Sequence, residues 1–129
     1  VPLPWSGSVA PFGFSPDDAP AEPWLPQPAH WAGRTVAVQQ SDETSFLQLY
    51  RAALRIRRTE PSLGDGPMRW LDSAPGVLAF ARDEHFASVT NLSGDSATLP
   101  AHHKVLLASM PLDADGTLPS NSSAWIRLA

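Results

Sequence analysis

The second half of the chain alternates apolar and polar residues in short runs. Six such runs lie between residues 62 and 129, namely PMRWLD, GVLAFARD, HFASVTNL, SATLP, KVLLAS and AWIRL. Residues that favour turns, mainly Gly, Pro, Asp, Asn and Ser, separate these runs. Runs of this length with turn signals between them are typical of antiparallel strands. The pattern therefore predicts a mainly β fold, an antiparallel β-sandwich with Greek-key-like connections.

A helical period marks residues 41–60, SDETSFLQLYRAALRIRRTE. We expect Ser41 or Asp42 to cap the beginning of this α-helix and Pro61 to end it. At about 100° per residue its apolar side chains cover an arc of roughly 220°, about twice the usual stripe. Leu47, Tyr50 and Leu54 form one edge of the arc, and Leu49, Ala52 and Ile56 form the other. Such a helix needs packing partners on two sides, and the predicted strands supply one.

The first 40 residues combine many prolines with large aromatic side chains. The prolines stand at positions 2, 4, 11, 16, 20, 23, 26 and 28, and the rings are Trp5, Phe12, Phe14, Trp24 and Trp31. Because proline lacks a backbone N–H and restricts its predecessor, we expect neither helix nor central strand in this region. Disordered tails are poor in aromatic residues. The stretch therefore predicts an extended, ordered loop whose rings pack on a surface outside it.

Composition and charge exclude several classes of function. The formal net charge is −4, which argues against nucleic acid because no basic surface would hold its phosphates. No stretch approaches the roughly 18 apolar residues of a membrane span, so no membrane partner is expected. The start has neither a basic region nor an apolar run, so we expect no signal peptide. The chain has no cysteine, which excludes disulfides and thiolate metal sites and favours a cytoplasmic location.

No arrangement of side chains in the sequence is typical of an active site. Most aspartates occupy predicted turns, where their carboxylates bond nearby backbone groups. The four histidines lack the spacing of a metal-binding motif. The serine-rich end contains no G-x-S-x-G nucleophile elbow, and no glycine-rich phosphate loop occurs. We therefore predict no catalytic residue, no metal and no cofactor in this chain.

Four stretches follow one another in a fixed order: VPLPWSG, FGFS, PWLP and VAVQQSDETSFLQLYRAALRIRRTEPSLGDG. This order closely resembles the C-terminal part of alpha-glucosidases of the alpha-amylase superfamily, including oligo-1,6-glucosidases and trehalose-converting relatives. The resemblance covers residues 1 to about 66 strongly, and the strand region agrees only in pattern. Leu3 departs from the usual Met, and Ala53 and Ile56 depart from the usual Leu. The residues at the positions of the family's motifs are Pro2, Trp5, Gly13, Phe14, Ser15, Trp24, Leu25, Pro26, Val36, Gln39, Ser45, Tyr50, Ala53, Ile56 and Arg57.

The resemblance implies a division of the chain and a role for it. Residues 1–61 would be the last loop and last helix of a (β/α)8 catalytic barrel, and residues 62–129 a C-terminal antiparallel β domain. The parent would be a retaining alpha-glucosidase that releases terminal alpha-linked glucose from oligosaccharides. Retaining enzymes need two carboxyl groups about 5–5.5 Å apart, which this family carries upstream. The chain is therefore expected to be inactive alone, to support the upstream barrel and to shape the rim of its pocket.

The resemblance also assigns aromatic residues to the sugar pocket. Loops at the C-terminal face of a (β/α)8 barrel build the active site, and aromatic faces suit the C–H edges of a sugar ring. Trp5 and Phe14 are the stronger candidates for substrate binding, and Trp24 is the next. The other tryptophans, Trp31, Trp70 and Trp125, are interpreted as core or domain-interface residues.

Two other functions fit the sequence. The chain is alternatively a stand-alone carbohydrate-binding β module with surface tryptophans, although the two-sided helix argues against this. It is otherwise the same part of a glucosyl-transferring or trehalose-converting relative, which would share the scaffold. In an isolated chain, one edge of the helix would be exposed because the barrel that covers it is missing. We therefore expect weak self-association of the isolated chain, since exposed apolar patches usually find a partner.

Overall fold

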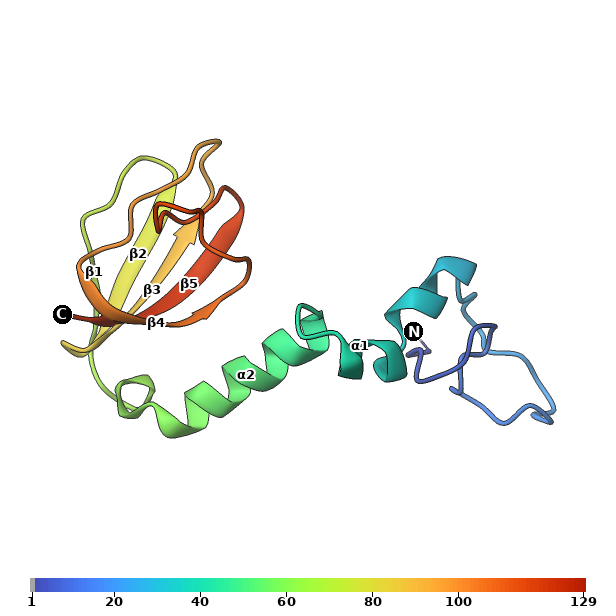
Figure 1. The fold of residues 1–129 in the computed structure, drawn as a ribbon. Coiled ribbons are helices and arrows are strands. Elements are labelled where there is room, and N and C mark those ends of the chain that lie inside the picture. Colours follow the sequence, from blue (N-terminus) through green and yellow to red (C-terminus); the bar gives the residue numbers. More distant parts are fainter. Residues whose placement is uncertain (1) are drawn as a thin grey trace. The chain divides into compact units, whose positions relative to one another are not determined.

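The computed structural model of the protein describes residues 2–129, and Val1 of the predicted barrel segment lies outside the described residues. The chain forms two compact units, Val1–Arg51 and Ala52–Ala129. Helix α2 (Phe46–Thr59) contains the boundary between them (Figure 1). The assignment of residues 1–61 to a barrel and of 62–129 to a β domain stays a prediction.

The second unit is built on an antiparallel sheet (Figure 1). Its strands are β1 (Met68–Trp70), β2 (Val77–Arg82), β3 (Phe86–Asn91), β4 (His102–Ala108) and β5 (Ser122–Leu128). Their order is β1-β2-β3-β5-β4, so β5 lies between β3 and β4. The predicted class, mainly β with antiparallel strands, is confirmed. Within residues 2–129 these five strands form one sheet.

One of the six predicted strands does not form. The SATLP segment contributes only an isolated bridge between Ala97 and Leu118, with N–H···O distances of 2.9 and 2.8 Å. The segment ends at Pro100, which has no N–H with which to continue a ladder. It therefore covers the core as a loop.

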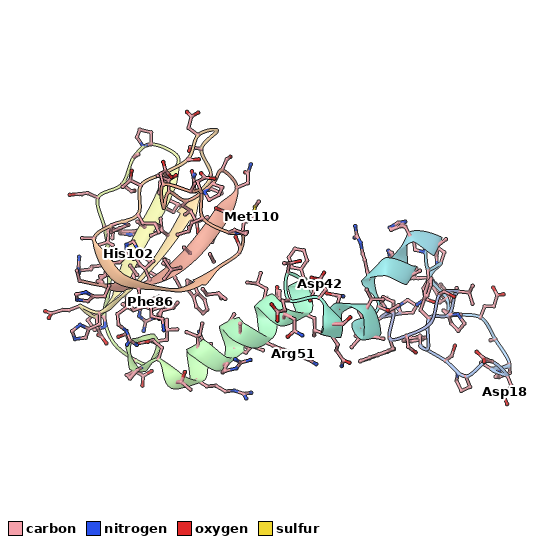
Figure 2. All side chains as sticks on the ribbon, in the orientation of Figure 1. Asp18, Asp42, Arg51, Phe86, His102 and Met110 are labelled. Atoms are coloured by element: carbon pink, nitrogen blue, oxygen red, sulfur yellow. The ribbon has the colours of Figure 1, made fainter. Side chains whose placement is uncertain are left out.

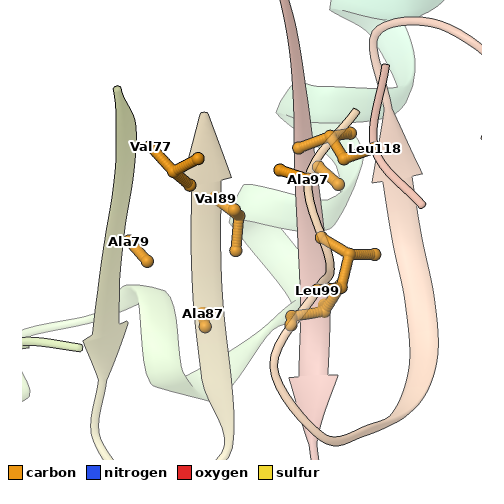
Figure 3. Close-up of a cluster of buried hydrophobic side chains, with 9 residues drawn as sticks. Val77, Ala79, Ala87, Val89, Ala97, Leu99 and Leu118 are labelled. Carbon is orange, nitrogen blue, oxygen red and sulfur yellow. The ribbon is translucent and has the colours of Figure 1, made fainter. Parts of the chain in front are cut away.

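The core lies on one face of the sheet. Along β2, Val77, Ala79 and Ala81 are buried while Leu78 between them is exposed, which is the alternation of a half-buried strand. Figure 3 shows the buried side chains of β2 and β3 beside those of the covering loops. The core cluster consists of Val77, Ala79, Ala87, Val89, Ala97, Leu99, Leu118, Ala124 and Ile126.

Asn91 is a fully buried polar residue at the end of β3. Its Nδ2 donates to the carbonyl oxygens of Asp95, Leu118 and Pro119 at 2.8, 2.9 and 3.1 Å. Its Oδ1 accepts from the N–H and the hydroxyl of Ser93 at 3.0 and 2.6 Å. The amide thus fastens two loops to the sheet, and burial leaves its own polar atoms dependent on these bonds.

Helix α2 ends as predicted and begins later than predicted. Its last residue is Thr59, and Pro61 opens the 3₁₀ helix η2 (Pro61–Leu63). The prediction that Ser41 or Asp42 caps the helix is wrong, because the Oγ of Ser45 accepts from the N–H of Gln48 at 3.3 Å. The carboxylate of Asp42 instead accepts from both N–H and hydroxyl of Thr44, which makes a turn before the helix.

The expected loop over residues 1–40 also contains helical turns at its end. A 3₁₀ helix, η1 (Ala29–Arg34), precedes α1 (Val36–Ser41). The expectation of no helix here is wrong because Pro28 is the last proline before Pro61, and each residue between the two has an N–H to donate. The buried Thr35 caps α1, accepting from the N–H of Val38 at 3.3 Å.

Part of the apolar arc of α2 is exposed, including Tyr50 and Leu54 of one predicted edge. Phe46, Tyr50 and Leu54 follow one another at every fourth position and are 75%, 64% and 52% exposed. The opposite edge is half-buried, and so is Leu47, whose N–H donates to Gln39 Oε1 at 3.1 Å. Self-association through the exposed edge stays a prediction. Within residues 2–129, every helix is too short or too polar to cross a membrane.

Candidate functional site

Trp5 and Phe14 lie on one closed loop of the first unit. The backbone N–H groups of Trp5 and Ser6 both donate to the carbonyl oxygen of Phe12, at 2.7 and 2.9 Å. The N–H of Phe14 donates to the carbonyl of Pro11 at 3.0 Å. These bonds close residues 5–14 into a loop, with the Phe12 ring buried and the Trp5 and Phe14 rings each 48% exposed.

Helix α1 anchors this loop. The N–H of Val36 donates to the carbonyl of Pro4, and the N–H of Ala37 donates to the carbonyl of Trp5, both at 3.0 Å. These donors belong to the first turn of α1, where a helix leaves its own N–H groups unpaired. The backbone of Trp5 is therefore held from two sides, which fixes where its ring emerges.

Gly13 permits the turn between the buried Phe12 and the exposed Phe14. Its φ of +67° lies in the left-handed region, which glycine adopts freely. A Cβ at this position would lie 2.6 Å from the hydroxyl of Ser6. The loop thus requires glycine here for both its conformation and its space.

Gly13→Ala should loosen the closed loop more than Gly7→Ala does. Both glycines have positive φ, at which a Cβ costs about 1–2 kcal/mol, but a Cβ at Gly7 would meet nothing within 4 Å. Hydrogen exchange at the amides of Trp5 and Ser6 should accelerate about tenfold in Gly13→Ala and clearly less in Gly7→Ala. Equal acceleration in both variants would show that the close approach to Ser6 is unimportant.

The structure does not bring Trp24 to this loop. Its side chain is 96% exposed, and it is absent from the backbone hydrogen bonds that close residues 5–14. Of the three candidates for substrate binding, Trp5 and Phe14 therefore share one fixed support and Trp24 stands apart.

A hollow of about 290 Å³ adjoins the closed loop of residues 5–14, since Ala10 and Pro11 of that loop help to line it. Two exposed carboxylates, Asp17 and Glu22, border it together with Gln27. The Oε1 of Gln27 is buried without a hydrogen-bond partner among the described residues, while its Nε2 donates to the carbonyl of Pro2 at 3.3 Å. The lining residues are Ala10, Pro11, Ser15, Pro16, Asp17, Ala19, Ala21, Glu22, Pro23, Leu25, Pro26 and Gln27.

The polar groups of this hollow suit a ligand that carries hydroxyl groups. Carboxylate oxygens and an amide oxygen accept hydrogen bonds, and sugar hydroxyls donate them. Sequence reasoning missed this set. The sequence did contain a signal for it. Residues 16–28 are mostly prolines and apolar residues, and the exceptions are Asp17, Asp18, Glu22 and Gln27. Figure 2 shows Asp18 at the tip of this loop, and Asp18 does not line the hollow.

Other carboxylates serve turns. The hydroxyl and N–H of Thr44 lower the pKa of Asp42, and those of Thr117 lower the pKa of Asp115 in the same way. Asp113 accepts from the hydroxyls of Ser96 and Thr117 at 2.6 and 3.2 Å. A general acid needs a raised pKa, so Asp42 and Asp115 are unsuited to that role. Residues 2–129 contain no cluster of three side chains able to hold a metal ion.

The remaining tryptophans differ in burial. Trp125 packs edge-on against the buried Phe86, with ring centroids 5.8 Å apart, and it is half-buried. Trp31 is also half-buried. Trp70 is 66% exposed, so it is not a core residue. It lies on the edge strand β1, where a side chain loses half of its possible neighbours.

Comparison with known proteins finds several similar enzymes. None of the protein-family models matches the chain. The whole chain is 32% identical over 139 residues to a probable alpha-glucosidase of Rhizobium meliloti (strain 1021) and spans 24% of it. Among solved structures, an alpha-glucosyl transfer enzyme is 29% identical, with a TM-score of 0.70 over 99% of this chain and 25% of its own. The chain is a relative of the alpha-glucosidases.

The predicted resemblance to an alpha-glucosidase is thereby confirmed. Isomaltulose synthase from Klebsiella sp. LX3 shares the fold, with a TM-score of 0.78 and 19% identity over 98% of this chain and 24% of its own. The chain thus spans about a quarter of the length of the curated alpha-glucosidase and of both solved enzymes.

Proposed function

We propose that the chain is the C-terminal, non-catalytic quarter of a retaining alpha-glucosidase that releases terminal alpha-linked glucose from oligosaccharides. The observation that carries this proposal is the match of the whole chain to one quarter of the R. meliloti alpha-glucosidase. In this proposal the catalytic carboxylates lie on the upstream barrel, and the enzyme is cytoplasmic.

The closed loop supplies the rim of the sugar pocket in this proposal. The half-exposed rings of Trp5 and Phe14 offer apolar faces to the C–H edges of a glucose unit. The hollow offers oxygen acceptors to its hydroxyl groups, since Asp17, Glu22 and Gln27 border it. A wall of rings with a few placed polar groups is the usual make-up of a small-molecule site.

A hybrid enzyme tests the proposal. In it, this chain replaces the matched quarter of the R. meliloti alpha-glucosidase, and p-nitrophenyl alpha-glucoside and maltose serve as substrates. The hybrid should hydrolyse both substrates, because the catalytic groups come from the relative and the rim from this chain. A soluble, folded hybrid without turnover would contradict the proposal.

In the hybrid, Trp5→Ala and Phe14→Ala should each raise the KM for maltose about tenfold and leave kcat within about twofold, as expected for lost uniform binding. Met110→Ala is the matched control, because Met110 is 49% exposed and lies in the second unit. Its KM should not change. An unchanged KM in both aromatic variants would show that these rings do not touch the sugar.

Glucosyl transfer is a second candidate, favoured by the 29% identity to an alpha-glucosyl transfer enzyme over 99% of the chain. Transfer differs from hydrolysis in the acceptor that attacks the glucosyl-enzyme, a sugar hydroxyl in place of water. The products of the hybrid at high maltose concentration distinguish the two reactions. More transfer product than the unmodified R. meliloti enzyme makes would favour transfer, and an equal amount would favour hydrolysis.

A further inference from the structure

The side chain of Gln39 bridges the ends of two helices. Its Nε2 donates to the carbonyl oxygen of Arg34, the last residue of η1, at 2.8 Å. Its Oε1 accepts from the N–H of Leu47, in the first turn of α2, at 3.1 Å. The end of a helix leaves such backbone groups without a partner inside that helix. One amide therefore satisfies a carbonyl group of η1 and an N–H group of α2.

The main chain of Gln39 takes part in the same junction. Its N–H donates to the carbonyl oxygen of Thr35 at 3.0 Å, and its carbonyl oxygen accepts from the hydroxyl of Ser45 at 2.8 Å. The hydroxyl oxygen of Ser45 also caps α2, because it accepts from the N–H of Gln48. Every polar group of Gln39 is thus engaged, and together these bonds fix α1 against the beginning of α2.

Helix α1 connects this junction to the closed loop of residues 5–14. The N–H groups of Val36 and Ala37 donate to the carbonyl oxygens of Pro4 and Trp5, both at 3.0 Å. Helix α1 has only six residues, and a helix shorter than about 12 residues is not stable by itself in water. Its position therefore depends on the bonds at its ends, of which Gln39 makes several. All of these residues belong to the first unit.

We propose that Gln39 is a positioning residue for the ring of Trp5 in substrate binding. This inference rests on the proposed function, in which that ring forms part of the rim of the sugar pocket. The ring is 48% exposed, so the hold on its backbone decides where it meets a sugar. Gln39 acts through α1 and does not contact the sugar. Its loss should weaken substrate binding and leave the catalytic groups in place.

In the hybrid enzyme, Gln39→Ala should raise the KM for maltose about threefold to tenfold and leave kcat within about twofold, because it displaces a binding group. A variant that was merely less stable would contain fewer active molecules, which lowers the apparent kcat at an unchanged KM. Gln40→Ala is the matched control. Gln40 is the neighbouring, exposed glutamine, and within residues 2–129 its side chain forms no hydrogen bond, although its carbonyl accepts from Gln48 Nε2. The KM of Gln40→Ala should not change.

The double variant Trp5→Ala, Gln39→Ala tests whether Gln39 acts through Trp5. Its KM should equal that of Trp5→Ala within about twofold, since no ring remains to be displaced. Effects that multiply in the double variant would show that Gln39 acts elsewhere, and they would overturn the inference. An active hybrid in which Gln39→Ala leaves the KM unchanged would also overturn it, and the proposed function would stand.

Hydrogen exchange in the isolated chain gives a readout that does not depend on the function. In Gln39→Ala, the amides of Val36 and Ala37 should exchange about tenfold faster, because α1 is no longer held at its end. The amides of Trp5 and Ser6, which close the loop on itself, should keep their rates. This pattern together with an inactive hybrid would refute the proposed function and support the hold of Gln39 on Trp5. Unchanged rates at Val36 and Ala37, or equal acceleration at all four amides, would overturn the inference.

Discussion

Asn91→Asp should lower the free energy of unfolding of the second unit by about 3 kcal/mol or more at pH 7, since it buries a charge without a cationic partner. The substitution conserves size and shape. It replaces the Nδ2 that donates to three carbonyl oxygens, at 2.8 to 3.1 Å, by an oxygen that repels them. Asn91 is 0% exposed, so water cannot screen that repulsion. Urea unfolding followed by tryptophan fluorescence measures the loss.

The loss should depend on pH. Burial and three carbonyl oxygens around the new carboxyl raise its pKa in the folded state above the unfolded value of about 3.9, and they outweigh the N–H and hydroxyl of Ser93, which lower it. A raised pKa favours the protonated form, so the loss is smallest below about pH 4 and grows as the pH rises through the folded pKa. The difference in unfolding free energy between variant and unsubstituted chain, taken at each pH, removes the effect of the other carboxyl groups.

Asn121→Asp is the matched control for this prediction. Asn121 is exposed, and among the described residues its Nδ2 donates to the hydroxyl of Ser120 alone, at 3.1 Å. Its φ of 55° is one that aspartate also tolerates. The unfolding free energy of the Asn121→Asp variant should differ from that of the unsubstituted chain by less than about 0.5 kcal/mol. A loss of equal size in both variants would show that the buried amide of Asn91 is not what fastens the loops.

Alternation along the chain predicts most of the sheet, because burial of one face leaves a signal in consecutive residues. In β2 the core-facing residues are Val77, Ala79 and Ala81, and Leu78 between the first two faces away. This alternation can be predicted from the sequence. The anchoring role of Asn91 is not, since two of its carbonyl partners lie 27 and 28 residues away. Pairings of that kind arise only when the loops fold back onto the sheet.

The misplaced helix start has a local physical cause. Ser41, Asp42 and Ser45 are all suitable caps by residue type. Thr44 decides among them, because its N–H and hydroxyl bond the carboxylate of Asp42 at 2.9 and 2.7 Å and make a turn there. That competition leaves Ser45 as the cap of α2.

The sequence predicted only part of the candidate site. The resemblance to alpha-glucosidases supplied Trp5 and Phe14, and the structure adds the closed loop on which they stand. The acceptors Asp17, Glu22 and Gln27 were missed, because a path set by several prolines brings them to one hollow and leaves no period to detect. Whether any of these residues binds sugar stays a prediction.

The isolated chain should release no glucose from p-nitrophenyl alpha-glucoside or from maltose. Retaining hydrolysis needs one carboxylate as nucleophile and one carboxylic acid of raised pKa about 5–5.5 Å from it. Asp42 and Asp115 have lowered pKa values through threonine hydrogen bonds, which suits neither to act as the acid. Glu60 is paired with Arg127.

A contaminating glucosidase is the main competing explanation for any turnover, and the Asn91→Asp variant controls for it. Purified in the same way from the same host, the variant carries the same contaminants and a destabilised second unit. Glucose release at equal rates in both preparations would come from the host. Release by the unsubstituted chain alone, in proportion to its concentration, would place a catalytic pair within these 129 residues and refute the non-catalytic role. Enzymatic rate enhancements are at least about 10⁶-fold, so even a small active fraction would be measurable.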